Sequence, residues 1–65
     1  RLLLDQIEAY VSALDAQTQA IFRLRLYGER TFPEIAAALE VPEPAVKAKY
    51  YRLMGRLRKE FDPRD

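Results

Sequence analysis

The fold of this chain is decided by the stretch from Thr31 to Lys59, which reads TFPEIAAALEVPEPAVKAKYYRLMGRLRK. Its first four residues fit a capping box, in which the Thr31 hydroxyl accepts a hydrogen bond from a free amide and the Glu34 carboxylate reaches back. Pro33 suits the first turn of a helix because it has no amide hydrogen to satisfy. Apolar residues then recur on one face as far as Leu39, so the pattern predicts a short helix that a neighbour must pack.

A tight turn at residues 40–42 separates this short helix from a long basic one. We expect the long helix to begin at Glu43 or Pro44 and to end near Phe61, because the prolines there forbid continuation from the preceding segment. Glu40 stands where such turns often use glycine, and we expect it to be strained by about 1 kcal/mol. Two helices joined by so short a turn form a helix-turn-helix, a unit often used to bind DNA.

Two further amphipathic helices are predicted before the capping box. The first spans residues 2–14, and its apolar residues, which we expect to face the core, are Leu3, Leu4, Ile7, Tyr10, Val11 and Leu14. The second follows Asp15, a good N-cap, and extends to Tyr27. It is apolar on two sides, so we expect it to pack between two neighbours, with Gly28 in the left-handed position that ends it. The expected fold class is all-α: a small four-helix domain that contains a helix-turn-helix.

The composition narrows the class of protein. Sixty-five residues make a single domain spanning 1–65, and a chain without cysteine or histidine offers no disulfide, no usual zinc site and no imidazole for acid–base chemistry. There is no nucleophile–base pair and no glycine-rich phosphate loop, so we expect neither an enzyme nor a cofactor. No apolar run could span a membrane and no signal peptide is visible, so we expect a cytoplasmic protein without a membrane partner. The chain begins at Arg1 rather than at methionine, and we expect it to be a fragment of a longer protein.

The charge of the chain is unevenly distributed, although its net value is only +1. Residues 44–61 carry six cations against one acid, whereas residues 1–43 carry four arginines against seven acids. A basic helix on a mildly acidic body is typical of a surface that binds nucleic acid. Arg23 and Arg25, in the second helix, are expected to meet solvent or a phosphate.

The exposed side of the long helix is the predicted DNA-binding face. Lys47 and Arg52 can reach guanine or a phosphate, and Tyr51 can pack on a thymine methyl group. The later cations would hold the DNA backbone, and the amino end of the short helix is a further phosphate site. The complete set of predicted DNA-binding residues is Arg30, Thr31, Lys47, Ala48, Tyr51, Arg52, Arg56 and Lys59.

Several short motifs follow the order and spacing of a known family. They are Leu14-Asp15, Ile21 to Leu26, Thr31 to Ala36, Leu39, Val46-Lys47, Arg52 and Leu57-Arg58. In these residues the chain resembles region 4 of bacterial RNA polymerase sigma factors, most closely the small extracytoplasmic-function type. The resemblance covers about residues 10–60.

The resemblance implies a domain of a sigma factor, which directs RNA polymerase in transcription initiation by binding double-stranded promoter DNA at the minus-thirty-five element. By matching positions, the groove-facing residues would be Lys47, Ala48, Tyr51 and Arg52. Arg30 and Thr31 would contact backbone phosphates. The resemblance also implies docking on the β-subunit flap of RNA polymerase through an apolar surface, and an anti-sigma factor as a further partner.

Departures from the family pattern leave two alternatives open. Glycine is common in the family where Glu40 stands, serine is common where Ala48 stands, and Glu43 adds a negative charge near the groove. The first alternative is the helix-turn-helix output domain of another transcription regulator, which would usually dimerise on paired half-sites. The second is a divergent sigma-like domain that mainly binds protein, the polymerase flap or an anti-sigma factor, through exposed residues such as Tyr50 and Leu26.

Overall fold

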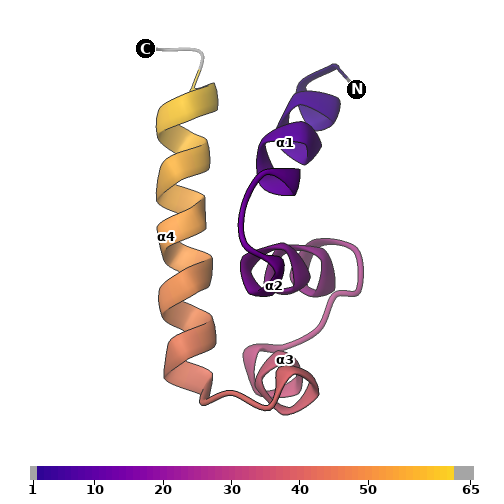
Figure 1. Ribbon diagram of the computed structural model, residues 1–65, viewed down its shortest axis with the longest axis vertical. Helices are drawn as coiled ribbons and strands as arrows, with labels where there is room; N and C mark the ends of the chain where they lie inside the picture. Colours follow the sequence, from indigo (N-terminus) through magenta and orange to yellow (C-terminus); the bar gives the residue numbers. More distant parts are fainter. Residues whose placement is uncertain (1, 63–65) are drawn as a thin grey trace.

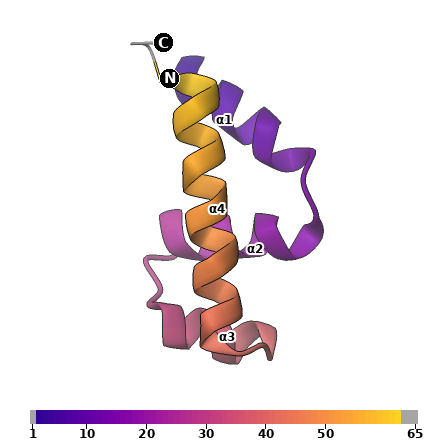
Figure 2. The ribbon, with the colours of Figure 1, turned by 90° about the vertical axis from the view of Figure 1, so that its left-hand side faces the viewer.

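The computed structural model describes residues 2–62, and within them the chain forms four helices (Figure 1). They are α1 (Leu2–Ser12), α2 (Ala16–Leu26), α3 (Phe32–Leu39) and α4 (Glu43–Phe61). The three shorter helices follow one another along the long axis of α4 (Figure 1, Figure 2). α3, the turn and α4 form the predicted helix-turn-helix, and with α1 and α2 they confirm the expected all-α four-helix fold. No helix within residues 2–62 combines the length and the apolar character needed to cross a membrane.

α2 lies between two apolar clusters, as its two-sided pattern predicts. On one side, Ile21 packs with buried residues of α3 and with Val46 of α4. On the other side, Phe22 packs with Val11 of α1 and with Leu53 of α4. Burying one such side chain contributes about 1.5–3 kcal/mol. Since α4 supplies residues to both clusters, the rotation of α4 about its own axis is fixed, and with it the direction of its outer face.

Side-chain caps determine where α2 and α3 begin. Asp15 caps α2 by accepting hydrogen bonds from the Thr18 amide at 3.0 Å and from the Thr18 hydroxyl at 2.8 Å. The predicted capping box of α3 is confirmed: the Glu34 amide donates to the Thr31 hydroxyl at 3.2 Å, and the Thr31 amide donates to the Glu34 carboxylate at 2.9 Å. The start of α4 has no side-chain cap, and Pro42 occupies its N-cap position.

Two glutamates take the left-handed backbone conformation. Glu40, with a φ of 58°, takes it in the turn after α3, as the sequence predicts, and its amide donates to the carbonyl oxygens of Ala36 and Ala37. The prediction for Gly28 is wrong, because the left-handed residue is its neighbour Glu29, with a φ of 53°. Gly28 has a different role: a Cβ atom there would lie only 2.8 Å from the Leu24 carbonyl oxygen.

α1 buries less of its apolar face than the pattern predicts, and it ends at Ser12 rather than at residue 14. Val11 is fully buried, but Leu3 is 53% exposed and Leu4 is 36% exposed. The reason is geometric, because only the later turns of α1 pack against α2 and α4. Leu2 and Leu3, in its first turn, therefore remain more than half exposed.

Candidate nucleic-acid interface

The outer face of α4 carries most of the residues predicted to bind DNA. All six predicted residues of α4 are exposed, and so are the two that precede α3. The opposite side of α4 is buried, because Val46 and Leu53 belong to the two core clusters. The predicted DNA-binding face therefore points away from the body of the domain. Exposure is what DNA contact requires, and the role of each residue in DNA binding stays a prediction.

The start of α3 lies beside the first turns of α4. The Phe32 ring centroid is 5.9 Å from that of Tyr51, and the Lys47 ammonium is 6.0 Å from the Phe32 ring centroid. Arg30 and Thr31 directly precede Phe32 in the chain. The structure therefore brings this predicted phosphate-binding pair to the first part of the α4 face, whereas the last two predicted cations lie two to three turns further along the helix.

An aromatic cluster, which sequence reasoning missed, supports this part of the face. The Phe32 ring contacts Tyr50 and Tyr51 at centroid distances of 5.3 and 5.9 Å, and the two tyrosine rings are 5.4 Å apart. The Arg25 guanidinium of α2 lies 4.4 Å from the Phe32 centroid and donates to the Arg30 carbonyl oxygen at 3.0 Å. A cation–π contact of this kind contributes about 0.5–1 kcal/mol. Arg25 is thus engaged by protein groups, where the sequence suggested solvent or a phosphate.

Arg23 is also engaged within the protein. Its guanidinium donates to the Gln19 side chain at 2.9 Å and lies 3.4 Å from the Glu8 carboxylate of α1. The same carboxylate accepts a hydrogen bond from the Tyr27 hydroxyl. Arg23 therefore helps to hold α1 to α2, and it belongs to a different part of the surface from the α4 face.

Ion pairs divide the cations of α4 into two groups. The Lys47 ammonium lies 3.2 Å from the Glu43 carboxylate, and the Lys49 ammonium lies 3.3 Å from the Asp15 carboxylate. The other four cations of α4 pair with no acid within residues 2–62: Arg52, Arg56, Arg58 and Lys59. All four of these side chains are exposed.

Two capping carboxylates hold their negative charge strongly. Hydrogen bonds from the Thr18 hydroxyl and amide lower the pKa of Asp15 to about 2, with a smaller contribution from Lys49. The hydrogen bond from the Thr31 amide likewise holds the pKa of Glu34 below its usual value. Neither carboxylate belongs to a metal site, since no group of three or more potential ligands gathers anywhere in residues 2–62.

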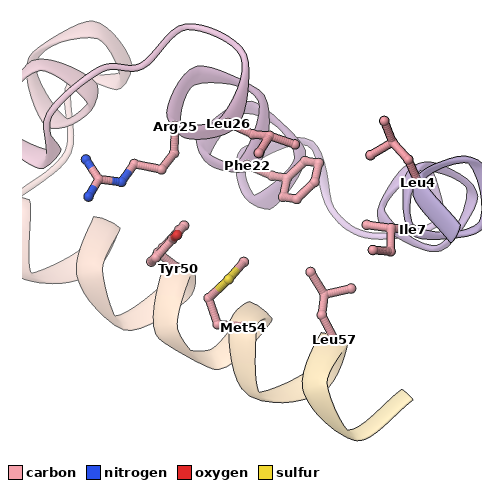
Figure 3. A pocket seen from close by; sticks show the side chains of 8 residues that line it. All are labelled: Leu4, Ile7, Phe22, Arg25, Leu26, Tyr50, Met54 and Leu57. Carbon is pink, nitrogen blue, oxygen red and sulfur yellow. The ribbon is translucent and has the colours of Figure 1, made fainter. Parts of the chain in front are cut away.

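A second surface, which we call the apolar groove, lies between α1, α2 and α4 (Figure 3). It has a volume of about 360 Å³ and is lined by Leu4, Ile7, Phe22, Arg25, Leu26, Tyr50, Met54 and Leu57. The groove residues of α4 lie about a third of a turn around the helix from the centre of the predicted DNA face.

The fold and the basic outer face of α4 define a small helix-turn-helix domain of the DNA-binding class. The chain belongs to the sigma-70 region 4 family, because the model of that family, described as Sigma-70, region 4, matches residues 4–57. The resemblance seen over about residues 10–60 is thereby confirmed at the level of the family. In sigma factors generally, region 4 binds the minus-thirty-five promoter element and interacts with RNA polymerase. Neither a curated protein nor a solved structure matches the chain.

Proposed function

We propose that this domain binds the minus-thirty-five element of promoter DNA as region 4 of an extracytoplasmic-function-type sigma factor. It would act in the cytoplasm together with RNA polymerase, by binding alone and without an enzymatic step. The observation that carries the proposal is the outer face of α4, the second helix of the helix-turn-helix, which holds four exposed cations without an ion-pair partner among the acids of residues 2–62.

α4 would lie in the major groove with its first turns against the base edges. Lys47 and Arg52 would donate to guanine or to phosphate oxygens, and the exposed Tyr51 would pack on a thymine methyl group. The later cations, Arg56 and Lys59, would hold phosphates. Arg30 and Thr31, which are both exposed at the start of α3, would contact a backbone phosphate.

The apolar groove would receive RNA polymerase. Its lining is almost entirely hydrocarbon, and Leu26, one of its residues, is 47% exposed in the isolated domain. An apolar helix fits such a groove, and we propose the β flap as its source. An anti-sigma factor that occupied the same groove would keep the domain from polymerase. Protein binding as the main role is the second candidate function, and this groove is the observation that favours it.

A salt titration separates DNA binding from protein docking. With about four to six phosphate contacts, the logarithm of the binding constant for duplex DNA should fall with the logarithm of salt concentration at a slope of about −4 to −5. Fluorescence anisotropy of a labelled duplex measures this slope. Binding that is absent, or that does not respond to salt, would leave the groove as the functional surface.

The stoichiometry of the complex separates this proposal from an output domain of another regulator. A sigma region 4 would bind one site as a monomer, whereas an output domain would bind paired half-sites as a dimer. Sedimentation of the chain with a saturating duplex should therefore give a one-to-one complex. A two-to-one complex would favour the other regulator.

A further inference from the structure

Glu43 and Lys47 place opposite charges side by side at the start of α4. The Glu43 Oε2 atom lies 3.2 Å from the Lys47 Nζ atom, and the two side chains are 38% and 50% exposed. Glu43 is the first residue of the helix, and Lys47 follows one turn later on the same side. Pro44 and Ala48, which follow them in the chain, are exposed, and the Phe32 ring centroid lies 6.0 Å from the Lys47 ammonium.

The pair has hydrogen-bonding capacity to spare. A carboxylate has two oxygens that accept, and an ammonium has three hydrogens that donate. The contact between Glu43 and Lys47 uses one carboxylate oxygen and one ammonium hydrogen. The second oxygen of Glu43 can therefore still accept a hydrogen bond, and the other hydrogens of Lys47 can still donate. A carboxylate alone would be repelled by the phosphates of DNA, but here the ammonium beside it offsets the negative charge.

We propose that Glu43 and Lys47 together read one C·G base pair in the major groove. The proposal rests on the DNA-binding function proposed above and assigns a base preference to it. In a C·G pair, the N4 amino group of cytosine is a donor, and guanine O6 and N7 are acceptors. The Glu43 carboxylate accepts from cytosine N4, and the Lys47 ammonium donates to guanine O6 or N7.

The same chemistry disfavours the other base pairs. Adenine also offers an amino group, but its N7 acceptor lies next to that group and repels the second oxygen of the carboxylate. Thymine and guanine present acceptors in the major groove, which repel the carboxylate directly. Cytosine is therefore the base that Glu43 selects, and Lys47 adds to this selectivity by donating to the paired guanine.

A purely structural role for Glu43 makes a different prediction. An acid at the start of a helix interacts favourably with the helix dipole, and the pair with Lys47 is a common stabilising arrangement. These effects change the stability of α4 and leave the preference among base pairs untouched. Base preference is therefore the readout that separates the two roles.

The test compares duplexes selected from a random library by the unmodified chain, by Glu43→Gln and by the control Glu60→Gln. The unmodified chain should enrich a motif with one strongly preferred C·G position. Glu43→Gln should keep the rest of the motif and lose preference at that position by roughly fivefold or more. The control removes the same charge about 25 Å away along α4 and should leave the motif unchanged.

The outcomes are distinguishable. If Glu43→Gln selects the unmodified motif, with equal or uniformly tighter binding, the pair reading is overturned while promoter binding stands. If the unmodified chain selects no motif, both are overturned. Circular dichroism shows whether Glu43→Gln folds; if it does not, Lys47→Met tests the same position, and an unchanged preference there overturns the proposal equally.

Discussion

Glu29 and Glu40 hold left-handed backbone conformations that cost a residue other than glycine on the order of 1 kcal/mol. The strain at Glu40 was predictable, because a turn of three residues between two helices leaves one position for it. At the end of α2 the sequence was misleading, because glycine is the usual residue in the left-handed conformation that ends a helix, and Gly28 stands beside the residue that takes it. Gly28 is instead required by its close approach to the Leu24 carbonyl oxygen, and the next residue takes the strain.

Replacing Glu40 with glycine should raise the free energy of unfolding by about 1 kcal/mol, because glycine takes a positive φ without a steric penalty. Urea denaturation followed by circular dichroism measures the change. The matched control is Ala37→Gly, at an exposed position inside the same helix, which should lower stability by about 1 kcal/mol. If both variants are destabilised alike, Glu40 is not strained in solution.

Asp15 should make the stability of the domain depend on acid pH. Its pKa in the folded state is about 2, below the ordinary 3.8, because Thr18 donates two hydrogen bonds to the carboxylate. A lowered pKa stabilises the folded state above the unfolded pKa, and this contribution is lost as the pH falls from about 4 to about 2. The free energy of unfolding should fall across this range, and Glu34 should add to the fall in the same direction.

The variant Asp15→Asn isolates this effect. Asparagine keeps an oxygen that can cap α2 but does not titrate. Urea denaturation at a series of pH values should therefore show a shallower acid decline for the variant than for the unmodified chain. Parallel declines would mean that the hydrogen bonds from Thr18 do not hold the Asp15 charge.

At the scale of the elements, α4 was the most predictable part of the chain and α1 the least. The stripe that includes Val46 and Leu53 determines which side of α4 is buried, so the exposed side could be deduced from the spacing alone. The same spacing in α1 overestimates burial, because periodicity does not reveal where neighbouring helices end. The contact of Arg25 with Phe32 could not be predicted from the sequence either, because it depends on how α2 and α3 pack against each other.

Two positions on α4 should respond differently to the loss of a cation. Arg52→Ala should weaken binding to the preferred duplex by about 1–3 kcal/mol and relax the sequence preference, because Arg52 lies in the turns that would face the bases. Lys59→Ala should weaken all duplexes alike and reduce the salt slope by about one, because it would contact a phosphate. Anisotropy titrations of matched and mutated duplexes measure both. If neither substitution changes binding, the assignment of the DNA face to α4 is wrong.

At the scale of the whole molecule, two surfaces share one small body. The outer side of α4 carries most of the predicted DNA-binding residues, and another side of α4 lines the apolar groove. Tyr50 belongs both to the groove and to the aromatic cluster beside Tyr51. The sequence predicted an apolar docking surface through the family resemblance, and it offered Tyr50 and Leu26, which line the groove, as residues that a protein partner could contact. Its location between three helices could not be read from the chain, because it depends on how the first turns of α1 project beyond the core.

Leu26→Asp should abolish most of the affinity for the polymerase flap and leave DNA binding unchanged. The aspartate would place a charge in the apolar groove, while the 47% exposure of Leu26 means that folding should tolerate it. The matched control is Leu2→Asp, at a position that is 73% exposed and outside the groove lining. Calorimetric titration with a flap fragment measures both; equal binding by Leu26→Asp would place the docking surface elsewhere.

Promoter recognition by α4 is tested most directly by selecting the unmodified chain on a random duplex library at several salt concentrations. We predict enrichment of a single, non-palindromic motif whose binding weakens steeply as salt rises. Such a result would also give the sequence of the promoter element. Failure to enrich any sequence, together with binding that ignores salt, would contradict promoter recognition and assign the function of the domain to its apolar groove.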